Sequence, residues 1–561
     1  MPIQIRVDRQ KIETQEGKSL TDVLAENKID LPDLAYQLKS GQIIHTDLVE
    51  DSSTNQVISA SELKTKDRMR VGLHSGLARQ HRREAFLMIK KELLQNDPKS
   101  VLCKKLDHVL QYDFSNPADE GVVAVHPMAQ AAELDATVCI GCNKCVEACQ
   151  RVGINYLKLV GEGRSKHVVA SDDPKIDCIY CGQCTVNCPV KSAREQSQIQ
   201  QVEMALADPE LVTIVQMAPS VRASIGEEFG AEIGINLEKK LFTAFRQLGF
   251  NHIFDVNMGA DITTLVEAQE LVERIKNGGV LPVFTSCCPA WVKFVEFYYP
   301  EMIPHLTEAR SPQIHSGGAY KSWWAEKEGI DPSKIRVISI MPCTSKKYEA
   351  RHEKLKVDGM WPVDYVLTTR ETAYLLKKNN INLLELEDSE LDSYGEYSGA
   401  GAIYGATGGV MESALRTAAY LLEGKDLEKL EFEQVRGMAG IKKAEVTFAG
   451  KTLKVAVATL ATNMHALIKE VKENPNAYHY IEFMACPGGC IGGGGQPIPA
   501  SDEKTAKRIE GLYKIDDSMK MRQAHHNKLA TEFVEYANNQ PKERKFDLLY
   551  THYSPRKKES E

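Results

Sequence analysis

The alternation of apolar and polar residues changes character near residue 211. From there on, short apolar runs alternate with longer segments whose apolar residues recur at helical spacing. We expect buried strands at residues 211–217, 252–256, 280–285, 336–341, 365–368, 455–460 and 481–484. Strands that alternate with amphipathic helices predict an α/β fold with largely parallel sheets. The last segment, residues 502–561, is polar and predicted to be helical.

The first 75 residues follow a different pattern. Residues 3–7 alternate like a strand, residues 17–27 favour a short helix, and two further strands are expected near 56–60 and 68–71. This order resembles the β-grasp domain of plant-type 2Fe-2S ferredoxins. Because no cysteine precedes Cys103, the domain cannot hold a 2Fe-2S cluster through thiolates.

Residues 76–130 form a linker region that begins with a basic amphipathic helix at 78–94. Its positive charges between Arg79 and Arg83 are expected to form a solvated face. The alternative is a docking surface for an acidic electron carrier. Cys103 has no second thiol nearby, so we expect it to be a buried structural thiol.

Composition narrows the classes of function. The chain has 561 residues, 43% of them apolar, and a net charge of -8, so nothing suggests nucleic acid or a polybasic membrane contact. No apolar run is long enough for a transmembrane helix, and the N-terminus resembles neither a signal peptide nor a transit peptide. We therefore expect a cytoplasmic protein. Without a secretory signal, clustering among the 14 cysteines favours metal binding over disulfides.

Two cysteine runs within residues 131–205 share the spacing C-x2-C-x2-C-x3-C. Three cysteines of such a run hold one face of a 4Fe-4S cubane, and the fourth ligates the other cluster. One expected ligand set is Cys139, Cys142, Cys145 and Cys188. The other is Cys178, Cys181, Cys184 and Cys149. Zinc is the alternative, but it prefers paired C-x2-C units, which the repeated triple spacing does not match. We predict a ferredoxin-like domain with two 4Fe-4S clusters that carry electrons.

Three more cysteine motifs begin where predicted strands end, which is where functional residues gather in open α/β sheets. They contain Cys287 with Cys288, then Cys343, and finally Cys486 with Cys490 in a glycine-rich turn. One of the first two, together with the other three, would complete four thiolates around a third cubane. One cysteine is then left over. The glycines of the last motif allow the backbone to approach a bulky inorganic group.

These motifs, TSCCPAW (285–291), MPCTSKKYE (341–349) and FMACPGGCIGGGGQ (483–496), closely resemble the signatures of iron-only (FeFe) hydrogenases. The resemblance runs from about residue 137 to 553. It implies a two-lobed catalytic domain with parallel and mixed sheets at 206–501. It also implies an H-cluster, in which a 4Fe-4S cubane is bridged to a diiron subsite with CO, CN and azadithiolate. The implied ligands are Cys288, Cys343, Cys486 and Cys490, with Cys490 as the bridge.

The resemblance also implies which side chains surround the H-cluster and relay protons. Backbone around Ala218, Pro219 and Ser220 and the Lys346 side chain would donate hydrogen bonds to cyanide. Further implied pocket residues are Gln313, Met341 and Met484, although the two methionines could be ordinary core. The implied proton relay consists of Cys287, Glu267, Thr307, Glu270 and Arg274, with Thr307 in place of the family's serine. The two glutamates and Arg274 share one helix face, so a solvated Glu270–Arg274 pair is the alternative.

The implied activity is the reversible reduction of protons to H2. A non-catalytic relative in Fe-S protein assembly is one alternative, and the retained Cys287, Glu267, Glu270 and Lys346 argue against it. A sensory relative is the other, and the retained Cys287 argues against it. Longer family members carry two more N-terminal clusters, whose ligands this chain lacks. We therefore expect electrons from a ferredoxin or partner subunit, within a multi-subunit complex, and maturation proteins that install the diiron subsite. A hydrogenosome-type organelle is the alternative location in a eukaryote.

Overall fold

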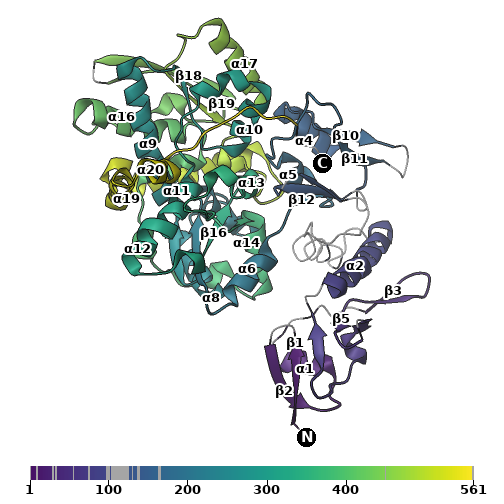
Figure 1. Ribbon diagram of the computed structural model, residues 1–561. Coiled ribbons are helices and arrows are strands. Elements are labelled where there is room, and N and C mark those ends of the chain that lie inside the picture. The colour runs from purple at the N-terminus through teal and green to yellow at the C-terminus, as the bar shows by residue number, and fades with distance from the viewer. Residues whose placement is uncertain are drawn as a thin grey trace. The chain divides into compact units, whose positions relative to one another are not determined.

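The computed structural model describes the chain except for residues 1, 8–9, 28, 30, 32–34, 55, 74–75, 97–101, 103–105, 107–124, 129, 136–138, 162–165, 449 and 559–561. Two compact units are present, Met1–Val123 and Ala124–Glu561 (Figure 1). Cys103, which we expected to be structural, lies outside the described residues. No helix among the residues described is long and apolar enough to cross a membrane.

The first unit contains a five-stranded sheet of order β2-β1-β7-β5-β6. Its strands are β1 (Pro2–Val7), β2 (Gln10–Gln15), β5 (Leu48–Asp51), β6 (Gln56–Ser59) and β7 (Arg70–Gly72). β1 pairs antiparallel with β2 and parallel with β7. Helix α1 (Leu20–Glu26) buries Leu20 and Val23 in the same hydrophobic core as Ile5 and Val49. The predicted strands and helix are present, and β2 and β5 were missed. A hairpin of β3 (Ala35–Gln37) and β4 (Ile43–His45) was missed as well.

The basic helix of this unit, α2 (Gly76–Asn96), does not present its described arginines to solvent. Arg82 and Arg83 are only 4% and 6% exposed, and the Arg82 guanidinium donates to the Leu73 carbonyl. Long basic side chains can cover apolar surface with their stems while the charged end reaches a backbone acceptor. The expectation of a solvated charged face was therefore wrong for these two positions, and neither is available as a docking charge.

The second unit begins with the segment that carries the two cysteine runs. A small sheet of order β12-β9-β8 is formed by β8 (Val125–Met128), β9 (Ala132–Asp135) and β12 (Ala193–Glu195). The hairpin of β10 (Leu157–Val160) and β11 (His167–Ala170) separates two short helices, α4 (Lys144–Val152) and α5 (Gln183–Asn187), which pack against each other. Helix α4 carries Cys145 and Cys149, and α5 carries Cys184 with Cys188 directly after it, so the two runs are brought together.

Two four-stranded sheets form the rest of this unit, and all seven predicted strands are present. In the first sheet, β14-β13-β16-β17, every pairing is parallel. Its strands are β13 (Val212–Met217), β14 (His252–Asp255), β16 (Ile335–Met341) and β17 (Tyr365–Thr368). The second sheet, β15-β20-β19-β18, is mixed because β18 runs antiparallel to β19. Its strands are β15 (Val283–Phe284), β18 (Ile441–Phe448), β19 (Lys451–Thr459) and β20 (Tyr480–Met484). The fold is thus mixed α/β, and β18 is the one strand of these two sheets that was missed.

Helix α9 (Val256–Asn277) runs beside α16 (Gly409–Glu423) in the second unit (Figure 1). It packs against α11 (Pro312–Ala319), α16 and the C-terminal helix α19 (Lys528–Asn538). Its N-terminus is fixed by Asp255, whose carboxylate accepts from Asn257 N. The C-terminal segment is helical as predicted, with α18 (Asp502–Ser518) and α20 (Lys542–Leu549) on either side of α19 along the chain. Buried residues run along most of α9, so its side chains can connect the interior with the surface.

Candidate active site

The sulfurs of the two cysteine runs fall into two groups in space. Burial, together with the nearby Cys188, Cys139 and Cys142, raises the pKa of Cys145 to about 12. In the second group, burial and the neighbouring Cys178, Cys181 and Cys149 raise the pKa of Cys184 well above its usual range. The fourth cysteine of each run therefore stands with the first three of the other run.

This grouping suits two iron-sulfur cubanes. Several thiols packed together and removed from water resist losing their protons, because the thiolates would repel one another. A cationic cluster reverses this preference, since it binds the thiolate form and neutralises its charge. The structure thus brings together the two ligand sets that the spacing predicted.

A third group of cysteines lies where the carboxyl ends of the two large sheets meet. Cys288 caps α10 (Pro289–Tyr298) after β15, Cys343 follows β16, and Cys486 and Cys490 follow β20. Burial and the neighbouring Cys288 and Cys343 raise the pKa of Cys490. All four line one cavity. Cys287 lines the same cavity and is 7% exposed.

The glycine-rich turn after β20 is pressed against neighbouring backbone. A Cβ atom on Gly489, which has a φ of +92°, would stand 2.7 Å from Thr407 N. On Gly493 it would stand 2.3 Å from the Pro342 carbonyl oxygen. On Gly494 it would stand 2.5 Å from the Cα of Gly182, in the second cysteine run. These glycines are therefore needed for close backbone packing around the cavity, a reason that the sequence did not reveal.

All the pocket residues expected from the sequence line this cavity. They are Ala218, Pro219, Ser220, Gln313, Met341, Lys346 and Met484. Ser220 Oγ and Gln313 Oε1 are buried and have no hydrogen-bond partner among the described residues. A buried polar atom without a partner is costly, so these two atoms fit a polar ligand in the cavity. The cyanide ligands of a diiron group would accept from the Ser220 hydroxyl, whereas Gln313 Oε1 is itself an acceptor and would need a donor such as the amine of the azadithiolate.

Lys346 is held in place by a carboxylate that the sequence analysis missed. Its Nζ lies 2.8 Å from Glu349 Oε2 and donates to the Cys287 carbonyl at 3.0 Å. Gln313 Nε2 donates to the same Glu349 oxygen at 2.6 Å. Burial by itself lowers the pKa of Lys346, but Glu349 more than offsets this and raises it, so the ammonium stays charged. The i,i+3 spacing of the two residues was the available signal.

The expected proton-relay residues extend from the cavity along α9. Glu267 is fully buried, and burial raises its pKa to about 8. Its Oε1 accepts from the Tyr480 hydroxyl, whereas Oε2 is buried without a hydrogen-bond partner among the described residues. The nearby Thr307 hydroxyl favours the charged form of this carboxylate. Thr307 Oγ1 lies 2.8 Å from Ser286 Oγ. Tyr480 and Ser286 were not predicted.

The outermost residues of the expected proton relay are Glu270 and Arg274, and they do not form a freely solvated pair. The two side chains are 17% and 16% exposed and contact each other. Glu270 Oε2 also accepts from Glu308 N at 3.0 Å, and Arg274 donates to the Leu306 carbonyl at 2.9 Å. The pair therefore fixes the loop around Thr307 while it leads towards solvent.

Comparisons with known proteins agree with this geometry. Residues 212–494 match the family model described as "Iron only hydrogenase large subunit, C-terminal domain", and residues 138–192 match "4Fe-4S dicluster domain". Iron hydrogenase 1 of Clostridium pasteurianum is 43% identical over 440 residues, covering 76% of this chain and 77% of that protein. The NADP-reducing hydrogenase subunit HndD of Solidesulfovibrio fructosivorans is 36% identical over 584 residues, covering 99% of both.

A solved structure supports the same assignment. A variant of the apo [FeFe]-hydrogenase HydA1 from Chlamydomonas reinhardtii aligns with a TM-score of 0.57 and 37% identity. The alignment covers 64% of this chain and 98% of that one. Both lines of comparison therefore give hydrogenases at 36% identity or more.

The chain belongs to the iron-only (FeFe) hydrogenase large-subunit family. It is an oxidoreductase that interconverts protons and H2, and its cofactors are two 4Fe-4S clusters and an H-cluster. The hydrogenase relatives at 36–43% identity favour this activity over the assembly alternative, because the cytosolic iron-sulfur assembly component 3 of Mus musculus and Bos taurus is only 27–28% identical.

Proposed function

We propose that electrons and protons reach the cavity by two separate routes. The observation that carries the proposal is the meeting, in one cavity, of four cysteines and a fifth thiol, Cys287, that a cubane does not need. When bound, the H-cluster supplies the redox-active iron at which protons and electrons combine. Its proposed ligands are Cys288, Cys343, Cys486 and Cys490, with Cys490 as the bridge to the diiron subsite.

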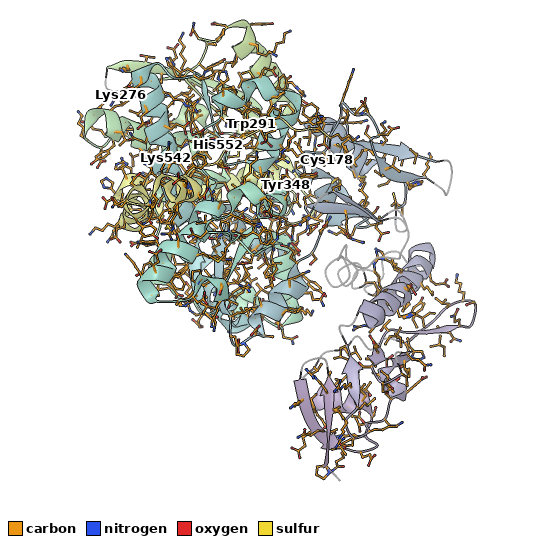
Figure 2. All side chains as sticks on the ribbon, in the orientation of Figure 1. Cys178, Lys276, Trp291, Tyr348, Lys542 and His552 are labelled. Carbon is orange, nitrogen blue, oxygen red and sulfur yellow. The ribbon has the colours of Figure 1, made fainter. Side chains whose placement is uncertain are left out.

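The electron route runs through the second cysteine group. Cys486 Sγ lies 3.9 Å from the Cys181 carbonyl oxygen, so a proposed ligand of the H-cluster contacts the turn that would hold the nearer 4Fe-4S cluster. Thr344, beside Cys343, donates to the Tyr180 carbonyl at 2.8 Å in the same turn. Figure 2 shows Cys178 and Tyr348 near the boundary between the ferredoxin-like segment and the rest of this unit. The two clusters would thus be neighbours held by interlocked backbone.

Replacing Lys293 by Met should lower the reduction potential of the cluster held by Cys149, Cys178, Cys181 and Cys184. Lys293 is buried, with Nζ 3.0 Å from Asp177 Oδ2 and 3.8 Å from the centre of the Tyr180 ring. Its charge opposes the increase in the pKa of Cys178 that burial produces, so it favours negative charge at this site. For the same reason, the positive charge of Lys293 favours the addition of an electron to the cluster. We expect a decrease on the order of 59 mV, which is a tenfold change for one electron.

Electron paramagnetic resonance during a redox titration measures this potential directly. Lys327→Met is the matched control, because Lys327 also stacks on a ring, Trp323, but is 42% exposed. An unchanged or higher potential in Lys293→Met, with full iron content, would show that Lys293 does not tune this cluster.

The proton route would run from Cys287 through Glu267, Thr307, Glu270 and Arg274. Cys287 Sγ would give its proton to the cavity and regain one from the Glu267 carboxyl, whose high pKa keeps it protonated near neutral pH. The Thr307 hydroxyl, which lies beside Glu267, would pass protons from the Glu270 side. Lys346, Ser220 and Gln313 would hold the cofactor, and Met341 and Met484 would exclude water beside it.

Replacing Thr307 by Val should slow H2 evolution by roughly a hundredfold, because the hydroxyl beside Glu267 is lost while the side-chain volume is kept. Thr307→Ser keeps the hydroxyl and should retain most of the activity. Dye-linked H2 evolution at equal iron content measures both. Equal rates for the Val and Ser variants would remove Thr307 from the route.

The proposal also covers the first unit and the partner. The five-stranded sheet with its parallel β1–β7 pair and helix α1 supports a β-grasp-like domain at residues 1–75 without a cluster. The remaining proposed boundaries are 76–130, 131–205, 206–501 and 502–561.

Similarity to HndD over 99% of both chains supports a multi-subunit complex in which a partner subunit or ferredoxin supplies electrons.

The electron partner can be tested with the purified chain and H2. We expect reduction of a low-potential ferredoxin or dye by the chain alone. We expect no reduction of NADP+ until a partner subunit is added. Reduction of NADP+ by the isolated chain would contradict the proposed need for a partner.

A further inference from the structure

Three potential metal ligands meet at the surface of the second unit, outside the cavity and the cysteine groups. They are Asp426, just after α16, and His525 and His526 of the short helix η13 (Ala524–His526). His525 Nε2 lies 2.9 Å from one carboxylate oxygen of Asp426, and His526 Nε2 lies 2.9 Å from the other. The three ligand atoms lie within 4.8 Å of one another. Nothing in the hydrogenase mechanism uses them.

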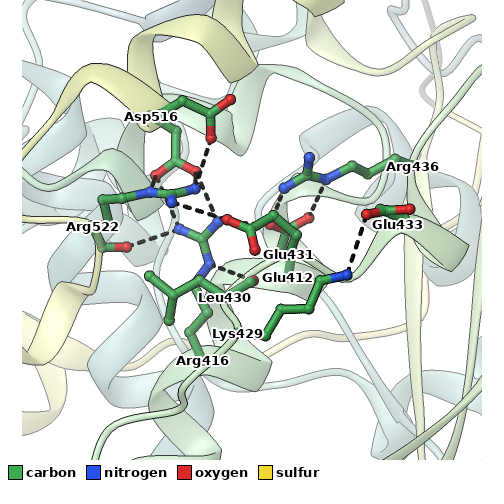
Figure 3. A network of polar contacts seen from close by, with 10 residues as sticks. Glu412, Arg416, Lys429, Leu430, Glu431, Glu433, Arg436, Asp516 and Arg522 are labelled. Carbon is green, nitrogen blue, oxygen red and sulfur yellow. Dashed lines mark hydrogen bonds and ion pairs between the residues drawn. The ribbon is translucent and has the colours of Figure 1, made fainter.

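The backbone that carries the two histidines is fixed by a largely buried network of ion pairs (Figure 3). Arg522, three residues before His525, contacts Asp516 Oδ2 at 2.6 Å and Glu431 Oε1 at 2.9 Å. Arg416 of α16 donates to the Arg522 carbonyl at 2.8 Å and to Asp516 Oδ2 at 2.8 Å. The same helix leads through Gly424 to Asp426, so one rigid element positions both sides of the cluster. Such preorganisation lowers the cost of binding a ligand.

The orientation of His525 is also set by its surroundings. Its ring stacks on Tyr420 of α16, with centroids 4.1 Å apart and an interplanar angle of 12°. Its Nδ1 lies 3.3 Å from Thr417 Oγ1, which leaves Nε2 directed at Asp426. A metal-bound histidine is typically held in this way by a hydrogen bond at its other nitrogen. Burial lowers the pKa of His525, which favours the neutral form that metals require.

We propose that Asp426, His525 and His526 form a binding site for a divalent cation of the Zn2+ class. Two imidazole nitrogens and one carboxylate oxygen are ligands that Zn2+ prefers over Mg2+ or Ca2+. Tetrahedral Zn2+ with bonds of about 2.0–2.1 Å needs ligand atoms about 3.3 Å apart, so small side-chain rotations suffice. His526 and Asp426 are 47% and 45% exposed, which leaves the fourth position to water. The ion would tie the loop after α16 to the C-terminal segment.

Hydrogen bonds alone are the competing explanation for the cluster, with each imidazole donating to one oxygen of Asp426. The two explanations differ in what added Zn2+ does. With hydrogen bonds alone, Zn2+ would bind no more tightly here than at another exposed histidine–carboxylate pair. His552 and Glu308 form such a pair, with 3.4 Å between nitrogen and oxygen, and they provide the matched comparison.

The test uses the anaerobically purified, tag-free protein with its iron-sulfur clusters, titrated with ZnCl2 in a calorimeter. We expect the unaltered chain to bind one Zn2+ more than His526→Ala and Asp426→Asn, or to bind it at least about tenfold more tightly. His552→Ala should bind like the unaltered chain. Only exposed side chains change, so all variants should fold, and Zn2+ displacing cluster iron would affect all of them equally.

The expected secondary effect is on unfolding. Because an ion that binds only the folded chain stabilises it, Zn2+ should raise the melting temperature of the unaltered protein and of His552→Ala, but not of His526→Ala. Equal Zn2+ stoichiometry and affinity in all four proteins would overturn the site. So would a preference for Mg2+ over Zn2+.

Discussion

Replacing Cys287 by Ala should nearly abolish H2 turnover while leaving the iron content unchanged. The thiol lines the cavity beside Cys288, and Glu267 is the strongest charged influence on it after burial. Ala has no proton to give or accept, so the proposed route is cut at its inner end. Losing a positioned proton-transfer group costs about 10²–10⁴-fold. Dye-linked H2 evolution and iron analysis, run on the same sample, measure both quantities.

Two further results make this experiment specific. Cys287→Ser keeps a proton donor of similar size, so its loss of rate should be smaller than that of the Ala variant. The infrared bands of cyanide and CO should persist in both variants, because Cys287 is not a proposed ligand. If Cys287→Ala evolves H2 at the parental rate, the spare thiol is not the inner end of the route.

Replacing Glu267 by Gln should lower the rate by a similar factor, about 10²–10⁴. An amide of the same shape keeps the packing against Tyr480 and Thr307 but cannot take up and release a proton. Glu308→Gln is the matched control, since Glu308 lies near the outer end of the route and is 49% exposed. A parental rate for Glu267→Gln, or an equal loss for both variants, would contradict the role of Glu267.

The same substitution should change how stability depends on pH. Burial raises the pKa of Glu267 from its ordinary 4.5 to about 8, so the folded chain holds this proton more tightly than the unfolded chain does. The contribution is fully present below pH 4.5, falls as the pH rises, and is lost above about 8. Gln carries no such proton. The decline in the free energy of unfolding between these pH values should therefore be shallower in the variant, as denaturant titrations at several pH values would show.

Much of the fold could be predicted because its strands are short, apolar and buried on both faces. The missed strand β18 shows the limit of that signal. Its sequence, IKKAEVTF, mixes lysines and a glutamate with apolar residues, and it lies at the edge of its sheet. The basic helix α2 shows a second limit. A run of arginines does not reveal that Arg82 finds a backbone acceptor inside its own unit.

The cysteines of the site were predictable from spacing and motif, because a cluster imposes fixed distances along the chain. The side chains that hold or contact the other site residues were not predictable in this way. Glu349 holds Lys346 and Gln313, Tyr480 donates to Glu267, and Ser286 contacts Thr307. Apart from Glu349 at i+3 from Lys346, these partners come from distant segments. Only the folded chain brings them together.

Infrared spectroscopy combined with an iron count, on protein produced with the maturation proteins, tests the central claim most directly. Three cysteine groups and one cavity predict iron for three 4Fe-4S cubanes and one diiron subsite, together with bands from bound CO and cyanide. Iron for three cubanes alone, without bands from CO and cyanide, in protein produced with active maturation proteins would contradict the assignment of the cavity to an H-cluster.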